Sequence, residues 1–146
     1  MFIGDVVNSG SIPALELTMR FSGARQRVLS HNIANYDSPN FRPLDASPAA
    51  FQKALGRAID ERRASTGGQS GDLTLPSTRE LRQSPSGDLL LTPRTSATGI
   101  LAQDRNNTDL ERLMQDHAEN TEVFRIASEL LRSRLTQLRD AMAERV

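Results

Sequence analysis

The sequence predicts a mostly α-helical chain, in which long N- and C-terminal helices pack as an antiparallel coiled-coil hairpin. Two observations predict the helices. Apolar residues recur at steps of three and four over 12–34, and a heptad pattern runs from Leu110 to Met142. A third observation separates them, because Ser, Gly and Pro residues interrupt any regular pattern over 64–107.

These patterns divide the chain into two parts. We expect 1–42 and 108–146 to form one inner domain built from the terminal helices. We expect 43–107 to form a flexible, largely irregular middle segment that contains a short helix near 49–63.

Composition limits the classes of partner and chemistry. The chain has 146 residues, enough for one domain, and its 18 basic residues balance 18 acidic ones. This balance argues against nucleic acid or an anionic membrane as a partner. The chain has no Cys, which excludes disulfides and thiolate metal sites. The N-terminus lacks the pattern of a cleavable signal peptide, and no apolar run is long enough to span a membrane.

The N-terminal helix is predicted to carry two apolar stripes, with Ser11 or Ser9 as its cap and Pro13 in its first turn. One stripe has polar gaps at Ser22 and Gln26. Its apolar members are Ile12, Leu15, Met19, Leu29 and Ile33. The second stripe consists of Ala14, Leu17, Phe21, Ala24 and Val28. A helix with two apolar faces needs two neighbours, so we expect other subunits to cover part of it. The alternative is a central helix in a small bundle.

The helix is predicted to end in a proline-containing turn. Asn32 and Asn35 have short amides that bond nearby backbone groups and favour helix ends. Pro39 followed by Asn40 indicates a turn with positive φ at Asn40, because Asn tolerates that conformation better than most residues.

The middle segment offers fewer signals. The helix near 49–63 has Phe51, Leu55 and Ile59 on one face and a charged end, 60–63, that we expect to be solvated. Beyond it, the run 89–91 is either one short strand or an extended hydrophobic anchor.

The C-terminal helix is predicted to begin with a capping box formed by Thr108 and Glu111. Its seam is predicted to consist of Leu110, Met114, His117, Thr121, Phe124, Ser128, Leu131, Leu135, Leu138 and Met142. The polar seam residue His117 is typical of a position that sets helix register. Some 35 residues make a helix of roughly 50 Å, which suits a rod better than a globule.

The sequence contains no pattern of a catalytic site. His31 and His117 lie far apart in sequence, and Asp60 and Glu61 diverge on a helix. No glycine-rich phosphate loop is present. We therefore expect no enzymatic activity, cofactor, metal or small-molecule substrate.

The turn resembles a known signature. Nine residues carry the resemblance: Ser30, Asn32, Ile33, Ala34, Asn35, Ser38, Pro39, Phe41 and Arg42. They are similar to the N-terminal pattern of the flagellar axial proteins, the rod and hook family. The chain departs from that pattern at His31, Ser38, Asn40 and Phe41, and every departure except His31 keeps hydroxyl, turn or aromatic character.

The C-terminal stretches 107–114, 118–121 and 130–139 resemble one of the two proximal-rod subunits of this family, and the short length agrees. The resemblance implies a structural subunit of the periplasmic basal-body rod, the drive shaft for motility. It also implies uncleaved export through the flagellar type III apparatus, and contacts with other proximal and distal rod proteins and with the membrane-ring junction at the rod base.

We expect assembly to use the inner coil formed by the two long helices. The residues expected there are Ile12, Leu15, Met19, Leu29, Ile33, Phe124, Leu131, Leu135 and Leu138. The alternative function is a helical interaction module, a dimeric regulator or chaperone that pairs through the C-terminal heptads. That alternative leaves the Asn-containing turn unexplained.

Overall fold

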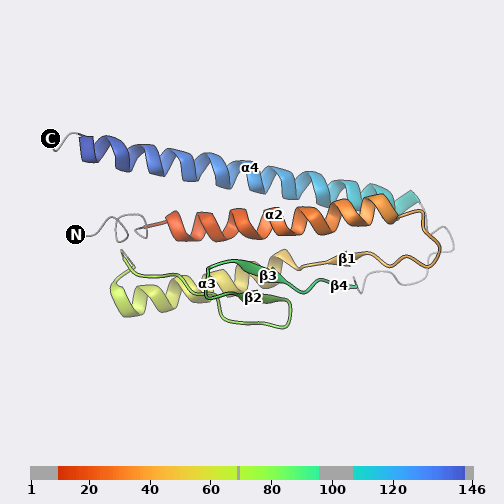
Figure 1. Ribbon diagram of the computed structural model, residues 1–146, viewed down its shortest axis with the longest axis horizontal. Coiled ribbons are helices and arrows are strands. Elements are labelled where there is room, and N and C mark those ends of the chain that lie inside the picture. The colour runs from red at the N-terminus through yellow and green to blue at the C-terminus, as the bar shows by residue number, and fades with distance from the viewer. Residues whose placement is uncertain (1–9, 69, 96–106, 144–146) are drawn as a thin grey trace.

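The computed structural model describes residues 10–68, 70–95 and 107–143. Its helices are α2 (Ile12–Asn35), α3 (Pro48–Thr66) and α4 (Asn107–Ala143). Its strands are β1 (Leu44–Asp45), β2 (Leu81–Gln83), β3 (Leu89–Leu91) and β4 (Arg94–Thr95). Figure 1 shows three layers, with α2 in the middle, α4 along one side, and α3 with the strands along the other. The described chain is therefore mostly helical, as the sequence predicts.

Helix α2 is covered on two sides within the same chain. It begins after Ser11, whose carbonyl accepts from the Leu15 N–H at 3.0 Å but whose side chain makes no capping bond. Leu17 and Phe21 are buried against the α3 layer, and the opposite side of the helix faces α4. Leu17 and Phe21 of the second stripe are therefore covered by the middle segment of the same chain and need no other subunit. The middle segment contributes a longer helix and more buried side chains than its composition indicated.

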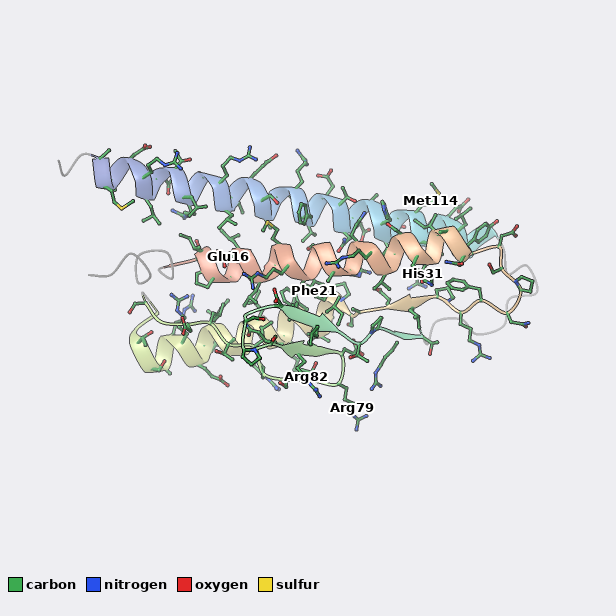
Figure 2. All side chains as sticks on the ribbon, viewed as in Figure 1. Glu16, Phe21, His31, Arg79, Arg82 and Met114 are labelled. Carbon is green, nitrogen blue, oxygen red and sulfur yellow. The ribbon has the colours of Figure 1, made fainter. Side chains whose placement is uncertain are left out.

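The hydrophobic core lies between α2 and the α3 layer. The rings of Phe21 and Phe51 stack with centroids 4.1 Å apart and an interplanar angle of 3°. The buried members are Leu17, Phe21, Ala46, Phe51, Ala54, Ala58, Leu73, Leu75 and Leu81. In this way α2 and the middle segment form one packed unit, with Phe21 pointing toward the strands (Figure 2).

Helix α3 confirms the short helix predicted near 49–63. Ser47 caps it, because its Oγ accepts from the Ala50 N–H at 3.2 Å, and Pro48 occupies the first position. Gly67 ends it in the left-handed conformation at φ 71°. Arg62 was expected on a solvated face but is buried, and its guanidinium donates to the carbonyls of Ser70 and Gly10.

The middle segment is less irregular than predicted. Strands β1 and β4 pair antiparallel, as do β2 and β3, in which Arg82 lies opposite Leu90. The run 89–91 is therefore a strand. A turn closes the second hairpin, in which the Ser84 N–H donates to the Asp88 carbonyl at 2.8 Å and Gly87 takes φ 83°. The buried leucines of this segment explain its folding, because each leaves water for the shared core.

Helix α4 has 37 residues and extends about 55 Å. It lies beside α2 (Figure 1), and its hydrogen bonds to α2 run in antiparallel order, since Asn120 contacts Ser22 and His117 contacts Gln26. The predicted seam differs from the observed burial over 113–128. Leu113, Asn120 and Ala127 are buried, whereas Met114 and Thr121, each one position further on, are exposed and Ser128 is half-buried. Leu135 and Met142 of the predicted seam are exposed too, as are the residues that precede them. The predicted capping box involves the Thr108 side chain, which lies outside the described part of the chain.

Candidate assembly site: the closing turn and the faces of the long helices

Asn32 fixes the path of the chain after α2. Its side chain is fully buried, its Nδ2 donates to the Leu44 carbonyl at 2.6 Å, and its Oδ1 accepts from the Leu44 N–H at 3.1 Å. One amide therefore satisfies both backbone groups of a residue in β1. No other side chain of this size presents a donor and an acceptor in that arrangement, except the longer Gln. Asn32 anchors β1 to the end of α2.

The turn itself has the local geometry that the sequence predicts. Asn35 donates from Nδ2 to the His31 carbonyl at 2.8 Å, at the end of the helix. The Phe41 N–H donates to the Ser38 carbonyl at 3.1 Å, and Asn40 takes φ 61°. The ring of Phe41 then meets His31 edge to face, with centroids 6.1 Å apart. The turn thus folds back against the last turns of α2.

The other turn residues occupy more open positions. Ser30, Ala34, Ser38, Pro39 and Arg42 are exposed, and Ile33 is half-buried. Only Asn32 among the nine turn residues is fully buried, so it is the one whose structural role is clearest.

Arg25 connects three elements of the fold. Its side chain is 7% exposed, and its guanidinium donates two bonds to the carboxylate of Asp45 in β1, at 2.8 and 2.7 Å. The Asp116 carboxylate of α4 lies 3.9 Å from the same guanidinium. Burial raises the pKa of Asp116 above its usual value and outweighs the opposing effect of Arg25. The Arg25 guanidinium therefore interacts with two carboxylates, and its shorter, bidentate interaction with Asp45 is the stronger one.

A polar network joins the middle of α2 to α4. Gln26 Nε2 lies 2.6 Å from His117 Nε2 and 3.0 Å from Thr121 Oγ1. Asn120 donates from Nδ2 to the Ser22 carbonyl at 2.9 Å and to Gln26 Oε1 at 2.5 Å. The polar gaps of the two helices thus meet each other, which fixes their register.

The residues expected in the inner coil lie in different environments. Ile12 and Leu29 are buried, while Leu15, Met19, Ile33, Leu131 and Leu138 are half-buried. Phe124 is 41% exposed, and its ring lies across Gly23 of α2, where an added Cβ would be 3.6 Å away. Leu135 is also 41% exposed.

Over the described residues, large hydrophobic side chains remain exposed, and nearly all of them belong to α4. The exposed ones are Leu90, Met114, Val123, Phe124, Ile126, Leu130, Leu135 and Met142. All but Leu90 lie on α4, and Figure 2 shows Met114 pointing away from α2. We call the seven α4 residues the α4 apolar surface. Contiguous exposed apolar patches on soluble proteins mark sites of protein interaction, so this surface is a candidate for one.

Sequence reasoning missed Arg25, Asp45 and Asn120. A signal for Arg25 existed, because it follows Leu17 and Phe21 at steps of four and so lies on a buried face. A charge at such a position needs a buried partner. Neither partner could be named, because Asp45 and Asp116 lie in other elements.

Within 10–68, 70–95 and 107–143, no three His, Cys, Asp or Glu side chains are grouped as a metal site would require. No described helix combines the length and apolar character needed to cross a membrane.

The long helix pair, the buried asparagine at its closing turn and the α4 apolar surface define a mostly helical protein with an exposed apolar helix face. No protein-family model matches the chain. Two relatives align with most of the chain. Flagellar basal body rod protein FlgB of Yersinia enterocolitica is 30% identical over 116 residues, 77% of this chain and 78% of the relative. Flagellar basal body rod protein FlgB of Borrelia hermsii is 34% identical over 104 residues, 68% of this chain and 71% of the relative. The chain belongs to the FlgB family of flagellar basal body rod proteins.

Proposed function

We propose that the chain is a structural subunit of the proximal rod and assembles with its neighbours through α2 and α4. The α4 apolar surface carries this proposal. Helix α2 covers α4 along one face only. Side chains such as Ile126 and Leu130, each 50% exposed, lie on the remaining faces of α4. In a rod, neighbouring subunits would remove this surface from water.

The energy available from this burial is large enough to drive assembly. Full burial of a large aliphatic or aromatic side chain contributes about 1.5–3 kcal/mol, and these side chains are about half exposed. Seven of them therefore contribute on the order of 5–10 kcal/mol, before the cost of association. That is comparable with the stability of a small domain.

The arrangement of the apolar surface suits open-ended packing. Val123, Ile126 and Leu130 follow one flank of the α2-facing seam, at steps of three and four. Leu135 and Met142 follow the other flank, seven residues apart. Two different patches on one helix can each meet a different patch on a neighbour, which produces helical filaments rather than closed dimers.

Family membership supports the rest of the proposal. Other rod proteins would be the lateral and axial neighbours of this chain, and the membrane-ring junction protein would contact the base of the rod. The chain would reach the periplasmic rod through the flagellar type III export apparatus without a cleaved signal peptide, and the finished rod would transmit torque for motility.

Mass spectrometry of purified hook–basal bodies tests the proposal directly. We expect the chain in a few copies per particle. Its absence from a preparation that contains the other rod proteins would contradict a rod function.

A matched pair of variants tests the surface. Ile126→Asp adds a charge within the apolar surface, and Thr136→Asp adds the same charge at another exposed position of α4. We expect both proteins to keep the melting temperature of the unaltered chain, whereas only Ile126→Asp loses incorporation and motility. Equal incorporation of both variants would mean that assembly does not use this surface.

A further inference from the structure

We propose that the outer face of the β2–β3 hairpin is a second interaction surface, and that it binds an acidic segment of a protein other than this chain. We call its three residues, Arg79, Arg82 and Leu90, the hairpin face. The hairpin lies on the opposite side of α2 from α4 (Figure 1), so the hairpin face is separate from the α4 apolar surface. Only the expectation that the partner is a flagellar component rests on the proposed function.

Strand register places Arg82 and Leu90 on one face. Side chains alternate between the two faces of a strand. The residues that point inward belong to the core or pack against it, and they are Leu81, Leu89 and Leu91. Arg82 and Leu90 lie directly opposite each other across the two strands, so they point outward together. Arg79 and Arg82 both point away from α2 in Figure 2.

Leu90 supplies the apolar contact of this surface. It is 57% exposed, and among the residues that the structure describes it is the one exposed large hydrophobic side chain outside α4. A single exposed leucine is ordinary by itself. This one, however, occupies the solvent side of a strand, where a polar residue is usual, and its cross-strand neighbour is an arginine. A partner that removes Leu90 from water therefore comes within reach of Arg82.

The two arginines of the hairpin face form no ion pair within the described chain. The nearest carboxylates in sequence make other hydrogen bonds. Glu80 accepts from the Ser47 N–H at 3.2 Å, and Asp88 accepts from the Ser86 hydroxyl at 2.9 Å. Both arginines are exposed, and a guanidinium can bind a carboxylate through two parallel bonds. The hairpin face thus offers two cations beside one apolar side chain, a combination that suits a protein interface.

The hairpin is held in place, so a partner meets a preformed surface. The Thr92 N–H donates to the Glu80 carbonyl at 2.8 Å where the two strands begin and end. At the turn, the Arg20 guanidinium of α2 donates to the Gly87 carbonyl. A surface fixed by such bonds loses little conformational freedom when it binds.

The carboxylates of this chain make a poor match for the hairpin face. On α4, Arg125 pairs with Glu122 at 2.6 Å and with Glu129 at 3.5 Å. The charged end of α3, 60–63, mixes acidic and basic residues. Acidic and basic residues are equally numerous in the chain, at 18 each. We therefore assign the partner to a different protein, whose contact segment carries a surplus of Asp and Glu beside an aliphatic side chain.

Site-specific photo-crosslinking in living cells tests the hairpin face. Leu90 is replaced by benzoylphenylalanine, and crosslinked peptides are identified by mass spectrometry. Gln52, exposed on α3, is the control position. We expect at least tenfold more of one adduct from position 90 than from position 52, with a peptide of another protein that holds more Asp and Glu than Lys and Arg. An adduct only with another copy of this chain, or none above the control, would overturn the proposal.

A matched pair of charge reversals tests the chemistry of the contact. Arg82→Glu reverses a charge of the hairpin face, and Arg57→Glu makes the same change at an exposed position of α3. We expect Arg82→Glu to reduce the adduct at position 90 at least tenfold, Arg79→Glu to act in the same direction, and Arg57→Glu to leave the yield within twofold. Melting temperatures should stay unchanged, because all three arginines are exposed. Equal adduct yields from Arg82→Glu and Arg57→Glu would overturn an acidic partner.

The crosslink is read in cells, so it is independent of the rod assignment. Absence of the chain from purified basal bodies would contradict the proposed function, whereas an acidic adduct in cells would still support the hairpin face. Presence of the chain in basal bodies, without an adduct at position 90 in cells, would overturn the hairpin face alone.

Discussion

The side chain of Asn32 pairs with both backbone groups of Leu44, twelve residues further along the chain, at 2.6 and 3.1 Å. This contact anchors β1 to the end of α2 and is completely buried at Asn32. Asn32→Ala removes both hydrogen bonds and leaves the Leu44 N–H and carbonyl without these partners. We expect the free energy of unfolding to fall by about 2–3 kcal/mol, measured by urea denaturation followed by circular dichroism.

Asn35→Ala is the matched control. Asn35 is an amide in the same helical turn, but its bond to the His31 carbonyl is exposed to solvent. We expect a loss of no more than about 1 kcal/mol, because water replaces the bond. Equal losses in the two variants would show that the Asn32–Leu44 pairing contributes no more to stability than a solvent-exposed hydrogen bond.

Arg25 is predicted to be the most sensitive charged residue of α2. Arg25→Met keeps much of the side-chain volume but leaves the Asp45 carboxylate without its fork of two bonds. We expect a loss of about 3 kcal/mol in the free energy of unfolding, near the lower end for a broken buried pair because Asp45 is 28% exposed. The loss in the free energy of unfolding for Arg25→Lys should lie between zero and the loss for Arg25→Met, because an ammonium group keeps the charge but cannot form the bidentate pair.

Arg27→Met provides the comparison. Arg27 lies two residues away on the same helix and is exposed. We expect its replacement to change stability by less than about 0.5 kcal/mol. A loss at Arg25 that does not exceed this value would contradict the structural role of the Arg25–Asp45 pair.

Asn40 is predicted to tolerate Gly but not a β-branched residue. Its φ of 61° lies in the left-handed region. Asn40→Gly should change the free energy of unfolding by less than about 0.5 kcal/mol, because Gly adopts this conformation without strain. Asn40→Val should lose about 1–2 kcal/mol. Thermal denaturation of both variants checks the prediction, and equal melting temperatures would contradict it.

Local chemistry made the turn and the helices predictable. Asn40 after Pro39 indicated positive φ, and apolar spacing indicated α3 through Phe51, Leu55 and Ile59. These features depend on residues within one or two turns of each other, which a sequence presents side by side. The pairing of Asn32 with Leu44 was only partly predictable, because the amide signalled a local bond but not its partner.

Long-range packing was harder to predict. The heptad pattern placed Met114 and Thr121 in the seam, whereas the buried residues are their neighbours Leu113 and Asn120. Periodicity shows which faces of a helix are apolar, but not which neighbour covers each face. Arg25 was missed for a related reason, since a single Arg usually lies at the surface and Asp45 belongs to another element.

Asp116 gives a pH-dependent prediction. Burial raises its pKa above the usual 3.8, Arg25 and Arg112 oppose the shift, and Asp45 and Glu119 reinforce it. The folded state therefore holds this proton more tightly than the unfolded state. It follows that ionisation of Asp116 costs stability, and that the cost is absent well below pH 3.8 and complete above the folded pKa.

Asp116→Asn removes this cost of ionisation. We expect the variant to be more stable than the unaltered chain at pH 7, by less than about 1 kcal/mol because the side chain is 33% exposed, and equally stable at about pH 3. Urea denaturation at both values measures the difference, with Asp140→Asn as a control for the loss of an exposed charge on the same helix. A variant that is less stable at pH 7 would mean that attraction to Arg25 outweighs burial, and that Asp116 fastens α4 to α2.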